Sequence, residues 1–196
     1  MEKTGDFLYN GPMNIPDHDK CLQILHEYGT PEHVIGHCTA VAMTALCIGR
    51  ALNEKGYHLD LDLILAAGLL HDIARVHPRH ELVGADFLVE LGYPEVADIV
   101  RVHMSYPAFH TGQEIDETDL VCLGDRVCKF DKYVGVDDRM EYIIDKHGRT
   151  PEVEKHIYSH KHVITDFIDE LEEIIGEPIN DVLKQDPNVP YAVPNE

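Results

Sequence analysis

Positive charge is scarce in this chain of 196 residues: 16 lysines and arginines stand against 36 aspartates and glutamates, which gives a net charge of −20 at pH 7. A surface that binds duplex DNA or RNA must neutralise many phosphates with lysine and arginine. We therefore expect no nucleic-acid duplex as a partner. A phosphorylated ligand would instead need a local group of cationic side chains or a metal ion.

Paired cysteine motifs and membrane-spanning runs are also missing. The 5 cysteines form no CxxC motif, and several lie in apolar helical patterns, which is typical of reduced thiols in a protein core. No stretch approaches the roughly 18 apolar residues that a membrane span requires. The opening MEKTGDFLYN lacks the charged-then-apolar layout of a signal peptide. We expect a soluble, cytoplasmic protein without a membrane partner.

Strand patterns are absent as well, because no segment alternates apolar and polar residues between hairpin turns. Apolar residues instead recur at helical spacing, and helices stop and restart at glycine and proline, as at Gly92 and Pro94. The fold class that we expect is all-α. The length and the 44% hydrophobic content suit one domain with a substantial core.

The domain boundaries follow from composition. Residues 1–16 show no clear period and are interpreted as an N-terminal arm, whereas helical signals run through 17–184 and indicate a single domain. The tail QDPNVPYAVPNE, residues 185–196, is rich in proline and polar residues, so we expect it to be extended or disordered.

Local signals predict where the helices begin and end. We expect Thr30 to cap a long helix that runs to about Lys55. A strongly apolar helix should then continue through Ala74, and residues 118–135 are interpreted as helix throughout.

Six histidines and aspartates fall within or at the ends of these apolar helices, although such side chains are expensive to bury unless something binds them. They are His37, His71, Asp72, His80, His103 and Asp125. Imidazole and carboxylate are ligands of Zn²⁺, Fe²⁺ and Mn²⁺, and six are too many for one catalytic ion with an open position. Two ions that share the carboxylate of Asp72 fit the count and could hold a hydroxide for in-line attack on phosphorus.

These residues and their surroundings resemble the HD-domain superfamily of metal-dependent phosphohydrolases. The resemblance covers residues 31–131 in four ordered blocks, HVIGHCTAVA, AAGLLHDIAR, HELVGADFLVELGYPEVADIVRVH and LVCLGDR. It implies an HD-domain bundle of about seven to nine helices, with its core at 31–131 and C-terminal helices at 137–184. The extra His80 is similar to that of the HDIG-type, dinuclear branch, which includes bacterial dinucleoside polyphosphate hydrolases.

The resemblance also implies how the ligands are shared. The first metal ion would be held by His37, His71, Asp72 and Asp125, and the second by Asp72, His80 and His103. Iron is the expected metal, with manganese, zinc, nickel, cobalt or magnesium as alternatives.

Three further side chains are candidates for contact with the substrate. Arg75 lies three residues after Asp72 on nearly the same helical face, and its guanidinium could hold a phosphate in a bidentate way. Asp72 and Arg75 are therefore the predicted catalytic residues. Arg126 could bind substrate likewise, or could form a structural ion pair. His110, in the loop SYPAFHTGQEIDE, could complete the second metal site, donate a proton to a leaving group, or be an ordinary loop histidine.

Three histidines late in the chain form a second cluster in the sequence, at positions His156, His160 and His162. Charged neighbours surround them, so we expect a solvated helix face rather than a separate metal site.

The expected function is a metal-dependent phosphohydrolase that cleaves a phosphoester or phosphoanhydride bond of a phosphorylated small molecule, a nucleotide being the leading candidate. Two alternatives stay open. A few HD proteins are di-iron oxygenases with the same ligands, and a regulatory domain could bind nucleotides without turnover. A homodimer is left open as well.

Overall fold

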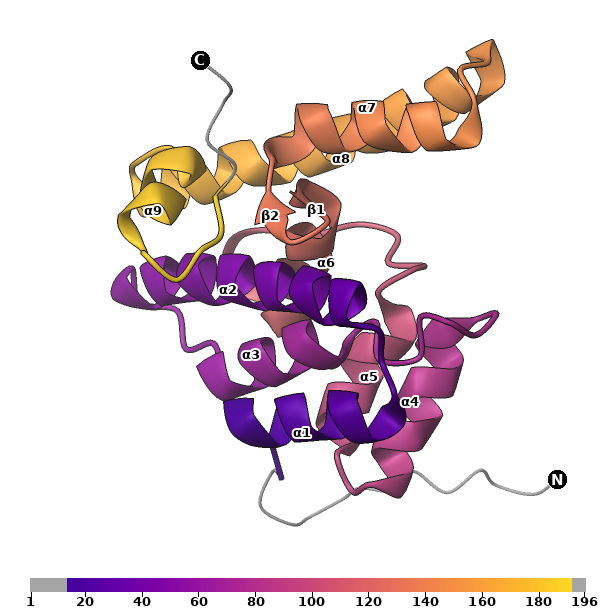
Figure 1. Ribbon diagram of the computed structural model, residues 1–196. Coiled ribbons are helices and arrows are strands. Elements are labelled where there is room, and N and C mark those ends of the chain that lie inside the picture. The colour runs from indigo at the N-terminus through magenta and orange to yellow at the C-terminus, as the bar shows by residue number, and fades with distance from the viewer. Residues whose placement is uncertain (1–13, 192–196) are drawn as a thin grey trace, which may run out of the picture.

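The computed structural model describes residues 14–191, and helices dominate it (Figure 1). The helices are α1 (His18–Tyr28), α2 (Glu32–Glu54), α3 (Leu61–Leu70), α4 (His80–Glu90), α5 (Pro94–Val102), α6 (Glu117–Val127), α7 (Gly135–His147), α8 (Pro151–Ile175) and α9 (Ile179–Gln185). Between them lie a 3-10 turn, η1 (Gly112–Glu114), and two strands, β1 (Cys128–Lys129) and β2 (Lys132–Tyr133). The expected all-α fold is confirmed, because each strand has only two residues.

The predicted arm and tail fall partly outside the described residues, at 1–13 and 192–196. The part of the tail that is described turns after α9, where the Val189 N–H donates to the carbonyl of Asp186 at 3.1 Å, and is anchored to the hairpin. The Tyr133 N–H donates a hydrogen bond to the carbonyl of Pro190 at 2.8 Å, and Val189 is buried. The chain after α9 therefore turns before Tyr191 pairs with Tyr133, and the expectation of an extended or disordered tail stays a prediction.

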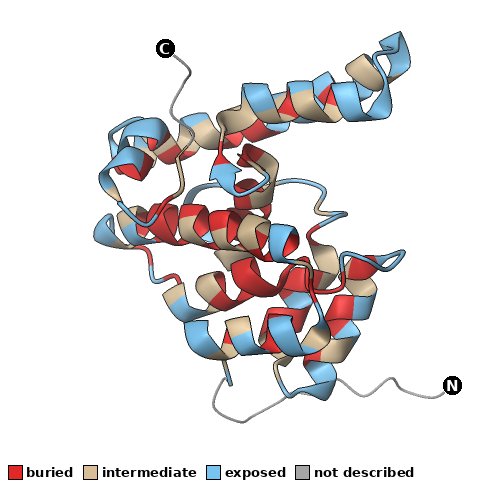
Figure 2. Cartoon of the chain, viewed as in Figure 1, coloured by how far each residue is buried: buried red, intermediate tan, exposed pale blue. Residues whose placement is uncertain are grey.

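Helix α2 is the central element of the fold and is buried along most of its length (Figure 2). It packs against α3, α6 and α9. Contrary to the expectation from sequence, α2 alone among the described helices is long and apolar enough to cross a membrane. Its most apolar window is 67% buried inside the fold, and core packing accounts for that composition.

Two glycines allow helices to approach α2 closely. A Cβ atom on Gly68 of α3 would lie 2.6 Å from the Cα of Ala42, and one on Gly124 of α6 would lie 2.9 Å from the carbonyl oxygen of Val41. Both contacts are with backbone, which cannot rotate out of the way as a side chain can. The two crossings bring together α2 and α6, which carry predicted metal ligands, and α3, which leads directly into two more.

Replacing Gly68 with alanine should lower the free energy of unfolding by about 3 kcal/mol, because the added methyl group overlaps the backbone of α2. Urea denaturation measures the change. Gly36→Ala in α2 is the matched control, since its Cβ would meet only Asp131 Cβ at 3.4 Å and alanine favours helix. Equal losses in the two variants would contradict the prediction.

Several helix ends carry signals that are visible in the local sequence. Asp17 caps α1 by accepting a hydrogen bond from the N–H of Lys20 at 2.8 Å. Gly92, with a φ of +85°, separates α4 from α5. Thr150 caps α8, which ends at Ile175.

Thr30 does not cap α2, as the sequence suggested. Pro31 occupies the cap position, and the Thr30 hydroxyl instead donates a hydrogen bond to the carbonyl of Ile73 at 2.8 Å. The buried hydroxyl thus ties the start of α2 to the turn that follows α3. A local capping rule does not consider the distant Ile73 carbonyl, and the hydrogen bond to it replaces the predicted cap of α2.

Helix α3 ends at Leu70, four residues before the predicted end at Ala74. The chain continues there in tight turns whose hydrogen bonds join residues three positions apart. One of them runs from the Arg75 N–H to the carbonyl of Asp72 at 2.9 Å. The histidine and aspartate that follow Leu70 therefore lie on a turn at the end of the apolar helix rather than within it.

The segment 118–135 is also not helical throughout. Helix α6 ends at Val127, and β1 and β2 form an antiparallel hairpin in which Cys128 pairs with Tyr133. Phe130 takes the left-handed conformation at the turn, with a φ of 53°. The turn contains neither glycine nor asparagine, so the usual hairpin signal is missing from the sequence.

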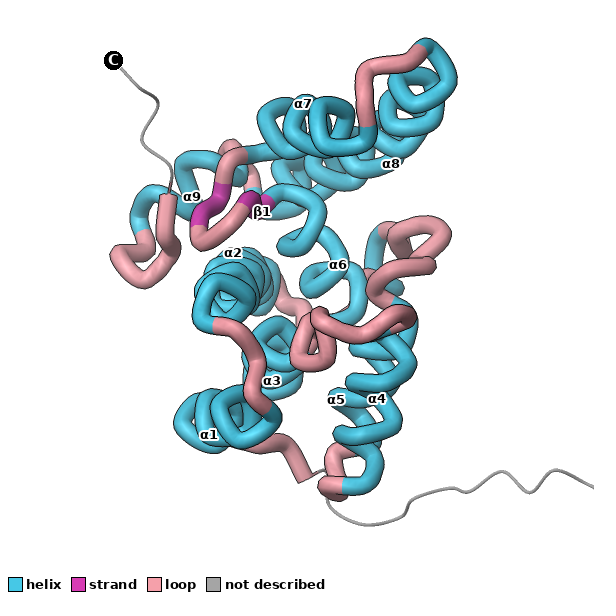
Figure 3. Tube along the Cα trace, turned by 45° about the vertical axis from the view of Figure 1, so that its right-hand side comes forward, coloured by secondary structure: helices cyan, strands magenta, loops and turns pink. Residues whose placement is uncertain are grey.

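Helices α7 and α8 pack against each other and extend beyond the other helices (Figures 1 and 3). Helix α7 also contacts α6 and β1, and α8 contacts α2 and α9. The contact with α6 places one face of α7 beside the helix that carries Asp125.

Candidate metal centre

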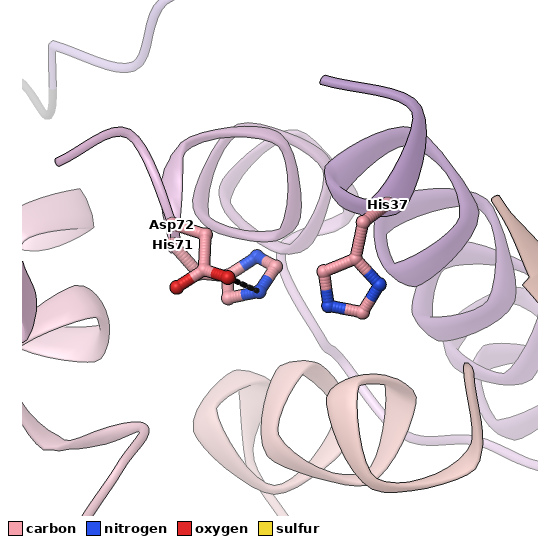
Figure 4. Close-up of side chains that lie close together, drawn as sticks. All are labelled: His37, His71 and Asp72. Carbon is pink, nitrogen blue, oxygen red and sulfur yellow. Dashed lines mark ion pairs between the residues drawn. The ribbon is translucent and has the colours of Figure 1, made fainter. Parts of the chain in front are cut away.

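The six predicted ligands come together in the structure. His37 lies on α2, His71 and Asp72 on the turn after α3, His80 at the start of α4, His103 directly after α5, and Asp125 on α6. Figure 4 shows three of them, His37, His71 and Asp72, around a common space. Their ligand atoms lie within 4.8 Å of one another, and the same limit holds for Asp72, His80 and His103. Asp72 belongs to both groups.

The two carboxylate oxygens of Asp72 face different histidines. Oδ2 lies 3.8 Å from Nε2 of His71, whereas Oδ1 lies 2.9 Å from Nε2 of His80 and 3.6 Å from Nε2 of His103. Asp125 closes the first group, because its Oδ1 lies 3.1 Å from Nε2 of His37. One carboxylate, that of Asp72, thus faces the histidines of both groups.

Backbone carbonyl groups fix the orientation of three of the imidazole rings. Since a carbonyl oxygen can only accept a hydrogen bond, the Nδ1 atom of each ring must donate, which leaves the Nε2 lone pair free for a metal. The pairs are His37 with Phe130 at 3.0 Å, His71 with Gly68 at 2.8 Å and His103 with Val100 at 2.7 Å.

The protonation states suit metal binding. Burial lowers the pKa of His71 to about 4, so its ring is neutral at pH 7. Burial by itself would raise the pKa of Asp72, but the neighbouring side chains of His71, His103, His80 and Arg75 outweigh it and hold the pKa below its usual range. Neutral imidazole and ionised carboxylate are the forms that bind metal ions.

Three buried atoms of this cluster lack a hydrogen-bond partner among the described residues: Nε2 of His71, Oδ1 of Asp72 and Nε2 of His103. Unpaired buried polar atoms are costly, and bound divalent cations would satisfy them. Asp72 and Asp125 raise the pKa of His103 even though burial opposes this, so the cluster favours positive charge. These residues fit a metal centre by their chemistry and by what they lack.

Arg75 reaches the centre as expected. Its Nε lies 3.3 Å from Oδ2 of Asp72, and its Nη1 lies 3.3 Å from both ring nitrogens of His80. The Arg75 side chain is 42% exposed and lines a cavity of about 590 Å³ in front of the cluster. It is therefore placed between the buried ligands and the space in which a substrate would lie.

Arg139 of α7 is a site residue that the sequence did not reveal. Its Nη2 lies 3.6 Å from Oδ1 of Asp125, and its side chain lines the same cavity. Burial would raise the pKa of Asp125, but the neighbouring side chains of His37, His71 and Arg139 together hold it below its usual range. A lone arginine on a polar helix carries no motif, so only the packing of α7 identifies it.

Arg126 also lines the cavity, but backbone groups hold its guanidinium. Nη1 donates to the carbonyl of Cys122 at 2.9 Å, and Nη2 donates to the carbonyl of Tyr106 at 3.2 Å. The guanidinium carbon lies 5.4 Å from the ring centre of Phe109. Arg126 thus joins α6 to the loop that follows α5.

His110 is not among the described residues that line this cavity. Its Nδ1 lies 3.1 Å from Oδ2 of Asp119, and its backbone N–H donates to Oδ1 of Asp119 at 2.9 Å. The Tyr106 hydroxyl donates to the same fully buried carboxylate at 2.8 Å. In the structure His110 therefore anchors its loop to α6, and its predicted contact with substrate remains a prediction.

The His110 contact should make loop stability depend on pH. The Asp119 charge raises the pKa of His110. The stabilisation from this ion pair is therefore complete below about pH 6.5, the ordinary histidine pKa, and is lost as the pH rises through the raised pKa of His110. We expect His110→Gln to lower the melting temperature at acidic pH and to have less effect at alkaline pH. Thermal unfolding across this range tests this, with exposed His162→Gln as control. A pH-independent difference would contradict it.

Sequence comparisons connect the chain with a known protein family. The family model of the HD domain matches residues 34–184. An uncharacterized protein of Methanocaldococcus jannaschii is 35% identical over 109 residues, which is 54% of this chain and 60% of that protein. A tRNA (cytidine(56)-2'-O)-methyltransferase of Thermoplasma volcanium is 36% identical over 94 residues, which is 46% of this chain and 26% of the methyltransferase. The matches thus span less than two thirds of either relative, and no solved structure matches the chain.

Proposed function

Because this chain belongs to the HD-domain family, whose members are generally metal-dependent hydrolases, we propose that it is a dinuclear phosphohydrolase. Its substrate would be a phosphorylated small molecule, a nucleotide first of all, in which it cleaves a phosphoester or phosphoanhydride bond. The observation that carries the proposal is the position of Asp72. One oxygen faces the group with His71 and the other faces His80 and His103, next to buried ligand atoms that lack partners.

The residues would divide the work as the geometry suggests. The first ion would be held by His37, His71, Asp72 and Asp125, and the second by Asp72, His80 and His103. The absence of a thiolate from this ligand set suits iron or manganese, with zinc as a further candidate. Bound metal ions would lower the pKa of a water molecule toward neutrality and offset charge on phosphoryl oxygens.

Two arginines would position the phosphoryl group. Arg75 contacts Asp72, Arg139 contacts Asp125, and both arginines line the cavity. A guanidinium can donate two parallel hydrogen bonds to phosphate oxygens. The two side chains supply the local positive charge that a phosphate needs in a protein whose net charge is −20. When substrate binds, each arginine would exchange part of its contact with a carboxylate for hydrogen bonds to the phosphate.

Anaerobic purification followed by metal analysis and a nucleotide screen tests the proposal. We expect about two ions per chain, and release of phosphate or nucleotide when Fe²⁺ or Mn²⁺ is present. The reaction should run at full rate without oxygen. Substrate-dependent oxygen consumption would favour an oxygenase instead, and tight nucleotide binding without product from correctly metallated protein would favour a regulatory domain. Either result would overturn the proposal.

A further inference from the structure

A second cavity, of about 540 Å³, lies between α7 and α8, and we call it the α7–α8 groove. Its floor is apolar and contains the buried side chains of Met140, Ile157 and Ile164. Its rim carries exposed polar side chains, including His156 and Glu152. The volume falls within the range of small-molecule sites, about 300 to 1,000 Å³.

The groove adjoins the cavity in front of the metal centre. Three side chains line both spaces, namely Arg126, Ile143 and His147. Ile143 and His147 lie one turn apart on α7, on the face that also carries Arg139 toward Asp125. A ligand whose phosphate sits beside the metal ligands could therefore extend into the groove without crossing an intervening element.

The lining indicates what kind of group would enter. A floor made only of aliphatic side chains with an aliphatic rim would suit an alkyl chain, but three histidines and a glutamate line this groove. Imidazole rings stack on flat heterocycles, and imidazole and carboxylate groups can bond to donors and acceptors on the edge of such a ring. The described residues group no third ligand with His156 and His160, so a metal ion is not the indicated occupant.

We propose that the α7–α8 groove binds a planar heteroaromatic ring, such as a nucleobase, that is joined to the phosphate at the metal centre. This inference rests on the proposed function and assigns the selectivity for the organic part of the substrate to α7 and α8. The buried floor would cover the ring faces, and the polar rim would bond to the ring edge. Residues outside the metal cluster would then decide which phosphorylated molecules bind tightly.

The test compares Val153→Trp, which fills the groove from α8, with Val163→Trp, an exposed site on the same helix that does not line it. The probes are the methylene phosphonate analogues of adenosine 5'-monophosphate, ribose 5-phosphate and decyl phosphate, which a phosphoesterase cannot cleave, measured by equilibrium binding to Mn²⁺-loaded protein. We expect the unsubstituted protein to bind the nucleotide about tenfold more tightly than ribose 5-phosphate, as one stacked ring would provide. Val153→Trp should remove this gain and leave binding of ribose 5-phosphate unchanged, whereas Val163→Trp should keep it.

A second measurement separates this inference from the proposed hydrolysis. Adenosine carries no phosphate, so it reports on the groove alone, and its addition should shift the NMR signal of the Met140 methyl group. Three results would overturn the inference even if the protein hydrolyses nucleotides. They are equal affinity for the nucleotide and ribose 5-phosphate, tighter binding of decyl phosphate than of the nucleotide, and no shift of the Met140 signal. A Met140 shift in a protein that hydrolyses nothing would support the groove and reject the proposed function.

Discussion

Replacing Asp72 with alanine should abolish binding of both metal ions and lower the rate of phosphate release by roughly a thousandfold. The physical reason is that one carboxylate serves both groups of ligands. Its Oδ2 faces His71 and its Oδ1 faces His80 and His103, and the side chain is almost completely buried. Without it, each ion would lose a ligand and a negative charge at once.

Metal analysis and thermal unfolding together test this prediction. Metal binds the folded state, so Mn²⁺ should raise the melting temperature of the unsubstituted protein but not that of Asp72→Ala. Asp72→Asn, which keeps the size and removes the charge, should behave like the alanine variant, and this guards against a variant that merely fails to fold. Asp138→Asn, at an exposed carboxylate of α7, serves as the control. Retention of both ions by Asp72→Ala would contradict the bridging role.

Replacing His80 with alanine should remove one ion of the pair and keep the other, with a loss of at least about a hundredfold in rate. His80 and His103 contact Oδ1 of Asp72, whereas His37 contacts Asp125 on the other side of the cluster. The first group therefore keeps all its side chains in the His80 variant. His37→Ala should weaken the opposite ion by the same reasoning.

Electron paramagnetic resonance of Mn²⁺-loaded protein shows whether the His80 variant binds a pair of ions or a single ion. A coupled pair of ions should give way to the signal of an isolated ion in His80→Ala. His77→Ala is the matched control, because this exposed histidine lies in the same turn region and outside both ligand groups. An isolated-ion signal already present in the unsubstituted protein, unchanged in His80→Ala, would show a mononuclear centre.

The candidate ligands were visible in the sequence because burial makes polar residues conspicuous. His71 and Asp72 directly follow an apolar run, and His103 ends an amphipathic helix, so each stands where a charge is expensive. Their convergence did not require knowledge of helix ends to within one residue. The structure brings all six together although α3 ends four residues earlier than predicted.

Local signals failed where a distant partner decided the conformation. The Thr30 hydroxyl is a good helix cap by residue type, yet it bonds to Ile73 across the fold. Phe130 adopts a left-handed turn that its residue type disfavours, and its carbonyl oxygen accepts the hydrogen bond that orients His37. Neither choice has a counterpart in the neighbouring sequence.

By itself, the sequence determined the helical class, helix boundaries such as those at Lys55 and Gly92, and the histidines and aspartates of the candidate centre, because periodicity, helix-ending glycines and polar residues in apolar patterns are properties of local sequence. Only the tertiary structure decided that Arg139 faces Asp125, that His110 anchors a loop to Asp119, and that the α7–α8 groove adjoins the metal centre. These features depend on how α7 and α8 pack on the rest of the fold. Such packing is set by contacts between residues far apart in the chain, which no local pattern records.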